Sequence, residues 1–123
     1  PQAGGYKPVS LEVQTRRLDD LVPADRKIDL IKIDVEGAEY QVLKGARRIL
    51  RESHPIVLFE FGLGGADEYG TRPEELFDLF ADAGLSVGLM EYFLEGKKPF
   101  SREEFCGQFY KSYNYFFIAY RSE

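Results

Sequence analysis

The stretch Lys32-Ile33-Asp34-Val35-Glu36-Gly37-Ala38-Glu39 decides the fold, because it joins a strand-like run of residues to a helix-like one. From Ile28 to Val35, apolar residues occupy positions 28, 30, 31, 33 and 35, which is close to continuous. A strand buried on both faces of a parallel sheet has this composition. From Ala38 to Arg51 the apolar residues follow the 3.6-residue period of a helix, with Gly45 inside it, where a glycine allows close approach to the sheet.

Three further segments surround this unit. Upstream, alternating apolar and polar residues predict a half-buried strand over Val9–Val13. A short helical turn follows over Leu18–Val22 and ends near Pro23. Downstream, Pro55–Phe61 is predicted to be a second buried strand, and a glycine-rich loop continues from Phe61 to Tyr69.

Two capping patterns organise the rest of the chain. Thr71-Arg72-Pro73-Glu74 predicts the start of a helix that ends at Gly84, and Ser101-Arg102-Glu103-Glu104 predicts a shorter helix through about Phe109. Further strands are predicted over Ser86–Phe93 and Tyr113–Tyr120. The alternation of strands and helices predicts an α/β fold with a mostly parallel sheet and an antiparallel last strand.

Composition excludes several classes of partner. Hydrophobic residues make up 44% of the chain and the formal net charge is -5, so we expect a packed core and no nucleic-acid partner. The longest apolar runs are much shorter than a membrane span, and we expect no membrane partner. Cys106 is the only cysteine, which excludes an intrachain disulfide and fits a reducing, cytoplasmic location.

The run from Asp29 to Glu39, followed by Val42-Leu43-Lys44-Gly45-Ala46, resembles the signature of the FkbM family of S-adenosylmethionine-dependent methyltransferases. Leu18-Asp19-Asp20-Leu21 upstream and the strand ending in Glu60 also fit the family's order, so the resemblance covers roughly residues 9–61. It implies a Rossmann-like class I methyltransferase sheet. It also implies S-adenosylmethionine as the cofactor and, as the acceptor, a small-molecule hydroxyl on a sugar, a polyketide or a similar compound.

The family's glycine-rich cofactor loop and its ribose-binding acid are not found in this sequence. The run Gly62-Leu63-Gly64-Gly65 does not replace the loop, because it follows a later strand and lacks the fingerprint spacing. We therefore interpret residues 1–123 as the C-terminal portion of one methyltransferase domain, inactive on its own. A degenerate or non-catalytic module that binds a partner is the alternative interpretation.

This interpretation also predicts how the chain associates. The strand Ile28–Val35 would lack a neighbour on one side, and an open apolar edge is a template for pairing with another chain. We expect a homodimer, or association with an N-terminal segment. The strand Val9–Val13 is the other candidate to cover that edge.

Acidic residues follow the two predicted parallel strands. Asp34 ends the first, Glu36 lies on the turn after it, and Glu60 ends the second, so their carboxylates are expected to converge where such sheets bind ligands. A carboxylate can take the proton of a hydroxyl nucleophile, so these three are the catalytic candidates. The cofactor contacts predicted from the motif are Asp34, Val35 and Glu36. The competing interpretation places Glu36 and Glu39 in a first helical turn, where negative charge is favoured, and leaves Glu60 as an ion-pair or capping residue.

Other polar residues are assigned structural or minor roles. Adjacent carboxylates resemble the Mg²⁺ site of catechol-type methyltransferases, but FkbM relatives are not defined by a metal, so we assign no metal ligand. Lys32 is expected to pair with Asp19 or Asp20. His54 is predicted at the surface, and Cys106 lacks a neighbouring base that would make it a nucleophile.

Overall fold

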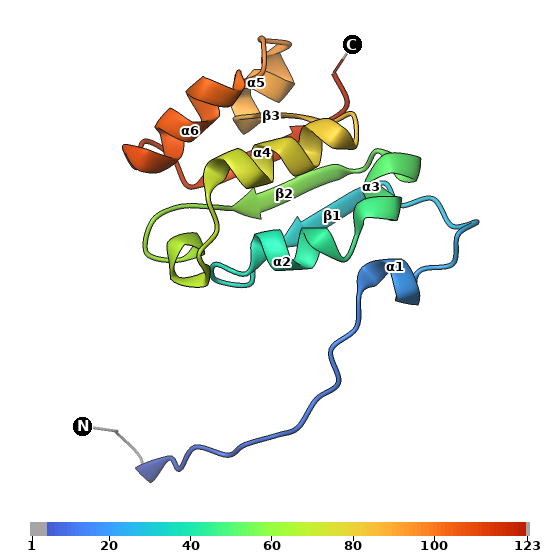
Figure 1. Cartoon of the computed structure of the whole chain (residues 1–123), viewed down its shortest axis with the longest axis vertical. Helices are drawn as coiled ribbons and strands as arrows, with labels where there is room; N and C mark the ends of the chain where they lie inside the picture. The colour runs from blue at the N-terminus through green and yellow to red at the C-terminus, as the bar shows by residue number, and fades with distance from the viewer. Residues whose placement is uncertain (1–4, 123) are drawn as a thin grey trace.

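A four-stranded mixed sheet organises the structure, a computed structural model that describes residues 5–122 (Figure 1). Its order is β1-β2-β4-β3. Strands β1 (Leu30–Ile33) and β2 (Ile56–Glu60) are parallel, and β4 (Phe116–Tyr120) lies antiparallel between β2 and β3 (Ser86–Gly88). The predicted combination of a parallel start and an antiparallel last strand is confirmed.

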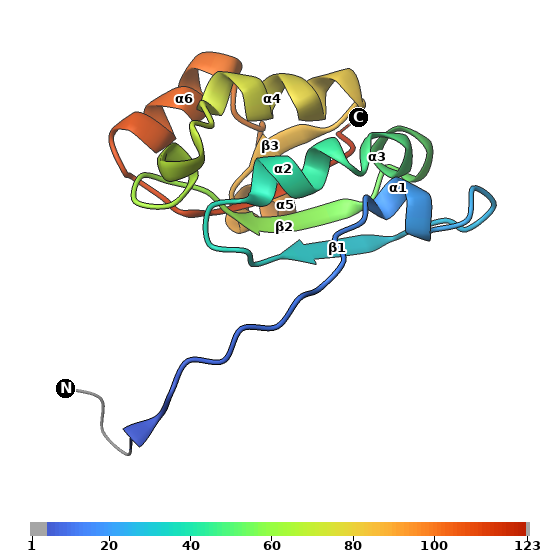
Figure 2. The same ribbon diagram turned by 60° about the horizontal axis from the view of Figure 1, so that its bottom comes forward.

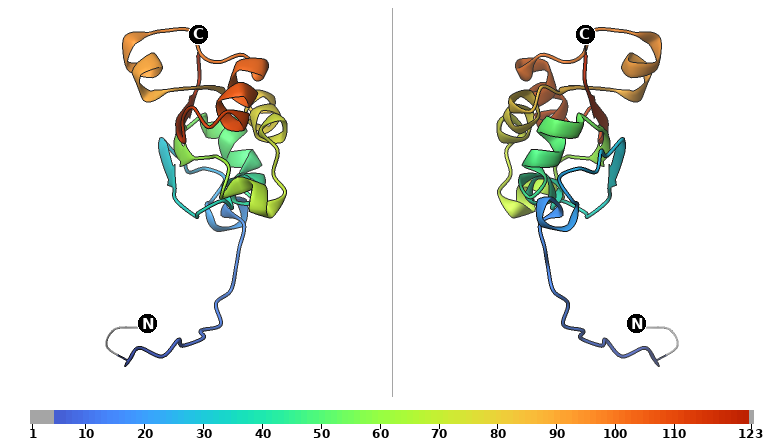
Figure 3. Two further views of the ribbon diagram at one scale, coloured as in Figure 1. Left: turned by 90° about the vertical axis from the view of Figure 1, so that its left-hand side faces the viewer. Right: turned by 90° about the vertical axis from the view of Figure 1, so that its right-hand side faces the viewer.

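Helices connect the strands and cover mainly one face of the sheet. Figure 3 shows α2, α3, α4 and α6 on one side of the sheet and α5 on the other. Within residues 5–122 no helix is long and apolar enough to span a membrane. The bounds are α1 (Leu18–Leu21), α2 (Glu39–Lys44), α3 (Arg47–Ser53), α4 (Pro73–Asp82), α5 (Met90–Glu95) and α6 (Arg102–Tyr110).

Aromatic side chains fill the space between the sheet and its helices. The Phe59 ring on β2 lies 5.2 Å from Phe80 of α4, and Phe117 on β4 lies 5.1 Å from Phe105 of α6, measured between ring centroids. All four side chains are buried. Tilted and edge-to-face rings at these separations stabilise the packing beyond the apolar area that they bury. The core therefore fixes β2 and β4, the two strands in the middle of the sheet.

Strand β1 is an edge strand among the described residues, not the doubly buried strand that its composition predicts (Figure 2). It is also shorter than the predicted Ile28–Val35. Ile33 faces the helices and is 5% exposed, whereas Leu30 is 58% exposed. The reason is that β2 pairs with one side of β1 only, and α2 and α3 lie over one face.

The predicted strand Val9–Val13 is wrong. These residues form an extended segment that leads away from the sheet, and Val9, Leu11 and Val13 are each at least 80% exposed (Figure 1). Alternation gives a segment one apolar face, but a strand also needs a neighbour to accept its backbone hydrogen bonds. This segment therefore does not cover the edge of β1.

The predicted helix from Ala38 to Arg51 is two helices, α2 and α3, separated at Gly45. The Gly45 carbonyl accepts a hydrogen bond from the amide of Asp19 (2.9 Å). The Asp19 carboxylate in turn accepts from the amides of Arg48 (2.9 Å) and Ile49 (3.1 Å), which satisfies the first turn of α3. A Cβ on Gly45 would lie 3.1 Å from the Arg17 Cβ, so the close approach is to the start of α1 and not to the sheet.

The expected ion pair between Lys32 and Asp19 or Asp20 is also wrong. The Asp19 carboxylate binds the backbone of α3, and Asp20 pairs with Arg17 at 2.9 Å. The Lys32 side chain is exposed on the open face of β1. Short backbone hydrogen bonds from the first turn of α3 hold Asp19 more effectively than a solvated lysine would.

Of the two predicted helix caps, one lies at the predicted residue and the other lies one residue later. Ser101 accepts from the Glu104 amide (3.1 Å) and donates its own amide to Glu104 (2.8 Å), so this capping box is confirmed. At α4 the N-cap is Arg72 instead of Thr71, with Glu75 closing the box from Arg72 and Pro73 as the first helical residue.

The remaining predicted strands are shorter in the structure. The segment Ser86–Phe93 forms a strand only as far as Gly88, because the helix-favouring run from Met90 to Glu95 becomes α5. The last strand begins at Phe116 instead of Tyr113, and α4 ends just before Gly84, whose φ of 80° is the left-handed conformation expected of a glycine there.

Candidate functional site

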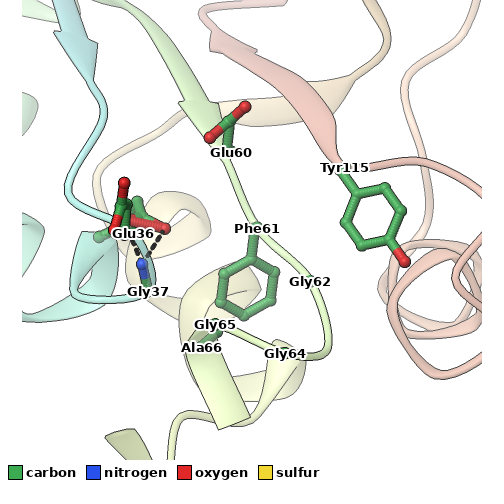
Figure 4. A pocket seen from close by; sticks show the side chains of 10 residues that line it. Glu36, Gly37, Glu60, Phe61, Gly62, Gly64, Gly65, Ala66 and Tyr115 are labelled. Atoms are coloured by element: carbon green, nitrogen blue, oxygen red, sulfur yellow. Dashed lines mark hydrogen bonds between the residues drawn. The ribbon is translucent and has the colours of Figure 1, made fainter. Parts of the chain in front are cut away.

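A pocket of about 380 Å³ opens beyond the carboxyl ends of β1 and β2 (Figure 4). Ligands bind at this end of open α/β sheets. The β1–α2 turn forms one side of the pocket, and the loop after β2 forms the other. Its described lining consists of Glu36, Gly37, Glu39, Glu60, Phe61, Gly62, Gly64, Gly65, Ala66 and Tyr115.

The turn after β1 is held in an unusual backbone conformation. Glu36 has a φ of 51° and Gly37 a φ of 113°, both in the region that side chains disfavour. A Cβ on Gly37 would lie 2.5 Å from the carbonyl oxygen of Gly65. Only glycine therefore lets the β1 turn lie directly on the loop that follows β2.

Glu39 is a buried carboxylate beside this turn, with 2% of its surface exposed. Its Oε1 and Oε2 both accept from the amide of Gly37, at 3.1 and 3.0 Å. Burial raises the pKa of the Glu39 carboxyl above its ordinary value, the negative charge of Glu60 acts in the same direction, and the backbone hydrogen bonds oppose the shift. The site thus contains a carboxylate that folding has removed from water.

The glycine-rich loop is fixed by hydrogen bonds on both sides. Phe61 donates its amide to the carbonyl of Tyr115 (2.8 Å), and Gly64 donates its amide to the Asp67 carboxylate (2.7 Å). A short 3₁₀ helix, η2 (Ala66–Tyr69), follows the loop. Figure 4 shows Tyr115 across from Glu60, on the segment that enters β4.

The three predicted acids are distributed over two cavities. Glu36 and Glu60 line the larger pocket, whereas Asp34 lines a smaller cavity of about 100 Å³ together with Glu60, Lys32 and the exposed Phe116. Glu60 is therefore shared, and Asp34 is not among the residues of the larger pocket. Val35, the third predicted cofactor contact, is 39% exposed beside Asp34 and lines neither cavity.

Sequence reasoning did not single out two members of the site, Glu39 and Tyr115. Glu39 was considered only as a residue of a first helical turn. It follows a glycine by two residues, however, a spacing that lets its side chain reach the glycine amide. Tyr115 is one of the tyrosines and phenylalanines from 105 to 120, which could line an acceptor pocket but are mostly explained by packing of a strand and a helix on the sheet. The sequence has no local signal that pairs Tyr115 with the distant Gly62.

The donors in the described residues do not fit a metal centre. Within residues 5–122 no three His, Cys, Asp or Glu side chains are grouped so that they could hold an ion. Burial raises the pKa of the Cys106 thiol, which disfavours the reactive thiolate. His54 is half-buried just after α3, next to Gly84 and apart from the pocket.

The mixed sheet has an acid-lined pocket at the carboxyl ends of its parallel strands β1 and β2. This arrangement is consistent with a methyltransferase-like α/β fold. The family model described as the methyltransferase FkbM domain matches residues 4–87, more than half of the chain. The chain therefore belongs to the FkbM methyltransferase family. No curated protein and no solved structure matches it.

Proposed function

We propose that this chain is part of an S-adenosylmethionine-dependent methyltransferase that methylates a hydroxyl on a sugar, a polyketide or another small molecule. One observation carries the proposal. The acids Glu36 and Glu60, from the family's signature and from the strand after it, line one pocket at the ends of two parallel strands. Family membership over residues 4–87 supports methyl transfer as the reaction.

The chemistry of the pocket suits this cofactor. Every charged residue in its described lining is a carboxylate: Glu36, Glu39 and Glu60. S-Adenosylmethionine carries a positive sulfonium and an ammonium group, which carboxylates attract. We propose that Asp34, Val35 and Glu36, at and just after the end of β1, contact the cofactor. When bound, the cofactor supplies an electrophilic methyl group.

The protein's part in the reaction is to orient the acceptor and receive its proton. A carboxylate within hydrogen-bond reach of a hydroxyl can act as the general base, and we assign that role to Glu36, Glu60 or Asp34. Glu36 is exposed and Glu60 half-buried, so both are accessible to a small molecule that enters the pocket. Tyr115 and the loop Gly62–Gly65 give the acceptor a defined wall, and positioning of this kind supplies much of the acceleration in such transfers.

The finer fold assignment is part of the same proposal. Parallel β1 and β2 joined through helices, followed by an antiparallel strand inserted in the sheet, support a Rossmann-like class I methyltransferase arrangement. We place residues 1–123 in the C-terminal portion of that domain. The single cysteine supports a reducing, cytoplasmic compartment.

Transfer of a labelled methyl group tests the function. The complete protein that contains this chain is incubated with methyl-labelled S-adenosylmethionine and a panel of glycosides and hydroxylated polyketides. We expect label in at least one hydroxyl compound, and much less with Glu60→Gln. Binding of the cofactor without transfer to any acceptor would instead support a degenerate module that binds a partner.

A further inference from the structure

The carboxylate of Glu39 is bonded to the turn after β1, and this turn lies against the loop after β2. It accepts the Gly37 amide through both oxygens, at 3.1 and 3.0 Å, and Gly37 in turn lies against Gly65 of the loop after β2. Glu36, which lines the pocket, immediately precedes this amide. The bond therefore fixes the one turn on which the position of Glu36 depends.

The interaction of Glu39 with the dipole of helix α2 does not account for this arrangement. Helix α2 has only six residues, and the bonded amide belongs to Gly37, which lies before the helix begins. The side chain is 2% exposed, and a buried carboxylate is costly unless hydrogen bonds compensate for its lost hydration. A solvated glutamate would favour the helix terminus equally well without that cost.

The backbone conformation shows what the bond holds in place. Glu36 is a non-glycine residue with a φ of 51°, and such strain persists only where the surroundings impose it. On one side the turn is bonded to Glu39, and on the other it is packed on Gly65 with no room for a Cβ. Without the carboxylate acceptor, the strained turn would be held by the contact with Gly65 and by one long hydrogen bond, from the Ala38 amide to the Val35 carbonyl (3.4 Å).

We propose that Glu39 is a positioning residue, which fixes the Glu36–Gly37 turn on Gly65 and thereby presents the Glu36 carboxylate to the pocket. The part of this inference that concerns methyl transfer rests on the proposed function. The part that concerns the turn depends only on the geometry of the chain. The two parts are tested separately.

Amide exchange tests the turn. Glu39→Met removes the acceptor at similar size, Glu39→Gln retains one acceptor oxygen, and Glu104→Met removes an amide-accepting glutamate from the first turn of α6, away from the pocket. We expect Glu39→Met to speed exchange of the Gly37 amide by at least ~10-fold, with Val57 in the core unchanged, because only local opening is affected. Glu39→Gln should lie between Glu39→Met and the native protein, and Glu104→Met should leave Gly37 unaffected. Unchanged Gly37 exchange in Glu39→Met, or equal acceleration at Val57, would overturn the proposal.

A double-mutant cycle tests the consequence for catalysis in the complete protein, with an acceptor found in the labelling screen. Glu39→Met should lower kcat by ~10-fold with the KM for S-adenosylmethionine within ~2-fold, and Glu39→Gln should restore most of the rate. In a Glu36→Gln background, Glu39→Met should cost less than ~2-fold, because it acts through a carboxylate that is already lost. Additive effects would overturn the positioning role. If no acceptor is methylated, the proposed function fails, whereas the exchange data still decide whether Glu39 holds the turn.

Discussion

The ring of Tyr115 lies against the backbone of Gly62, so closely that a Cβ on Gly62 would be 2.3 Å from a ring carbon. The two residues belong to segments more than fifty positions apart, and both line the pocket. Gly62 is buried, whereas Tyr115 is 47% exposed. Because Gly62 has no side chain, the Tyr115 ring can pack against its backbone at the pocket.

Gly62→Ala should displace the Tyr115 ring without unfolding the protein, because an exposed side chain can rotate away. We expect the free energy of unfolding to fall by less than ~1.5 kcal/mol, within the range of ordinary substitutions, while methyl transfer falls several-fold. Gly37→Ala is the contrasting variant, since its Cβ meets the backbone of Gly65 and its φ is 113°. Urea titration and the transfer assay measure both, and equal stability losses would contradict this explanation.

Asp34→Asn should reduce turnover or cofactor affinity by at least ~10-fold in the complete enzyme with little change in stability, as loss of a poised carboxylate usually does. Asp34 is exposed at the carboxyl end of β1, so little packing depends on it. Asp29→Asn, just before the other end of the same strand, is the matched control and should have native kinetics. Unchanged kinetics in Asp34→Asn would assign Asp34 a structural role.

Asp19→Ala should destabilise the fold by about 1–2 kcal/mol, because two amides in the first turn of α3 lose their acceptor. The neighbouring substitution Asp20→Ala removes only an exposed ion pair with Arg17 and should destabilise the fold less than Asp19→Ala does. Thermal or urea unfolding distinguishes the two. A larger loss of stability for Asp20→Ala than for Asp19→Ala would contradict the assignment of Asp19 as the cap that links α1 to α3.

The buried Glu39 should make the free energy of unfolding decrease as the pH rises. Its pKa is raised from 4.5 in the folded state, chiefly by burial, so the folded protein binds the proton more tightly than the unfolded chain. Its contribution therefore becomes less favourable as pH rises from about the unfolded value of 4.5 through the folded pKa. Glu39→Gln removes this trend, so its stability relative to the native protein should improve across that window.

Glu104→Gln provides the opposite sign. The Ser101 amide lowers the pKa of Glu104, so its carboxylate stabilises the fold above the unfolded pKa, and that contribution is lost as pH falls through the folded pKa. The substitution should therefore be more harmful at neutral than at acidic pH. Urea midpoints of all three proteins between pH 4 and 7 measure these differences, and parallel trends for the two variants would refute the assignment.

The open edge of β1 leads us to expect association. Within the described residues β1 pairs only with β2, and Leu30 beside that edge is 58% exposed. Light scattering should give a mass above the 14.1 kDa of one chain, as a homodimer or as a complex with an N-terminal segment of the domain. Leu30→Lys should weaken that association, and Leu94→Lys on α5 should not. A stable monomer of one chain mass would show that the edge does not recruit a partner.

Local patterns predicted the elements whose contacts are local. Ser101 and Glu104 lie three residues apart, and Leu76 and Phe80 share one helix face, so spacing alone locates α6 and the core side of α4. The break at Gly45 was missed because the residue that caps α3, Asp19, lies before β1. Tyr115 was not singled out from the other aromatic residues for a similar reason, because Gly62, against which its ring lies, is in the loop after β2.

For the acidic residues, too, the sequence predicted the position along the chain but not the surroundings of the side chain. The predicted strands placed Asp34 and Glu60 at strand ends and Glu36 on the turn after the first strand, and the structure has them at these positions. The sequence provided no measure of burial, however, so Glu39 was considered only as a residue of a first helical turn. Whether a carboxylate is buried here depends on how the loop after β2 packs against Gly37. The residues of that loop are distant from Glu39 in the sequence.

The position of β4 has a consequence for the order of synthesis. Residues 116–120 fill the gap between β2 and β3, although both of those strands leave the ribosome earlier. Until β4 arrives, β2 has a bonding partner on one side only, and the loop from Phe61 lacks the Tyr115 carbonyl that receives its amide. Contacts between segments that are distant in the sequence form late in folding, and a strand edge that is still unpaired is prone to aggregate. A ribosome that stalls after α6 would therefore hold a chain with its signature motif complete and its pocket still open.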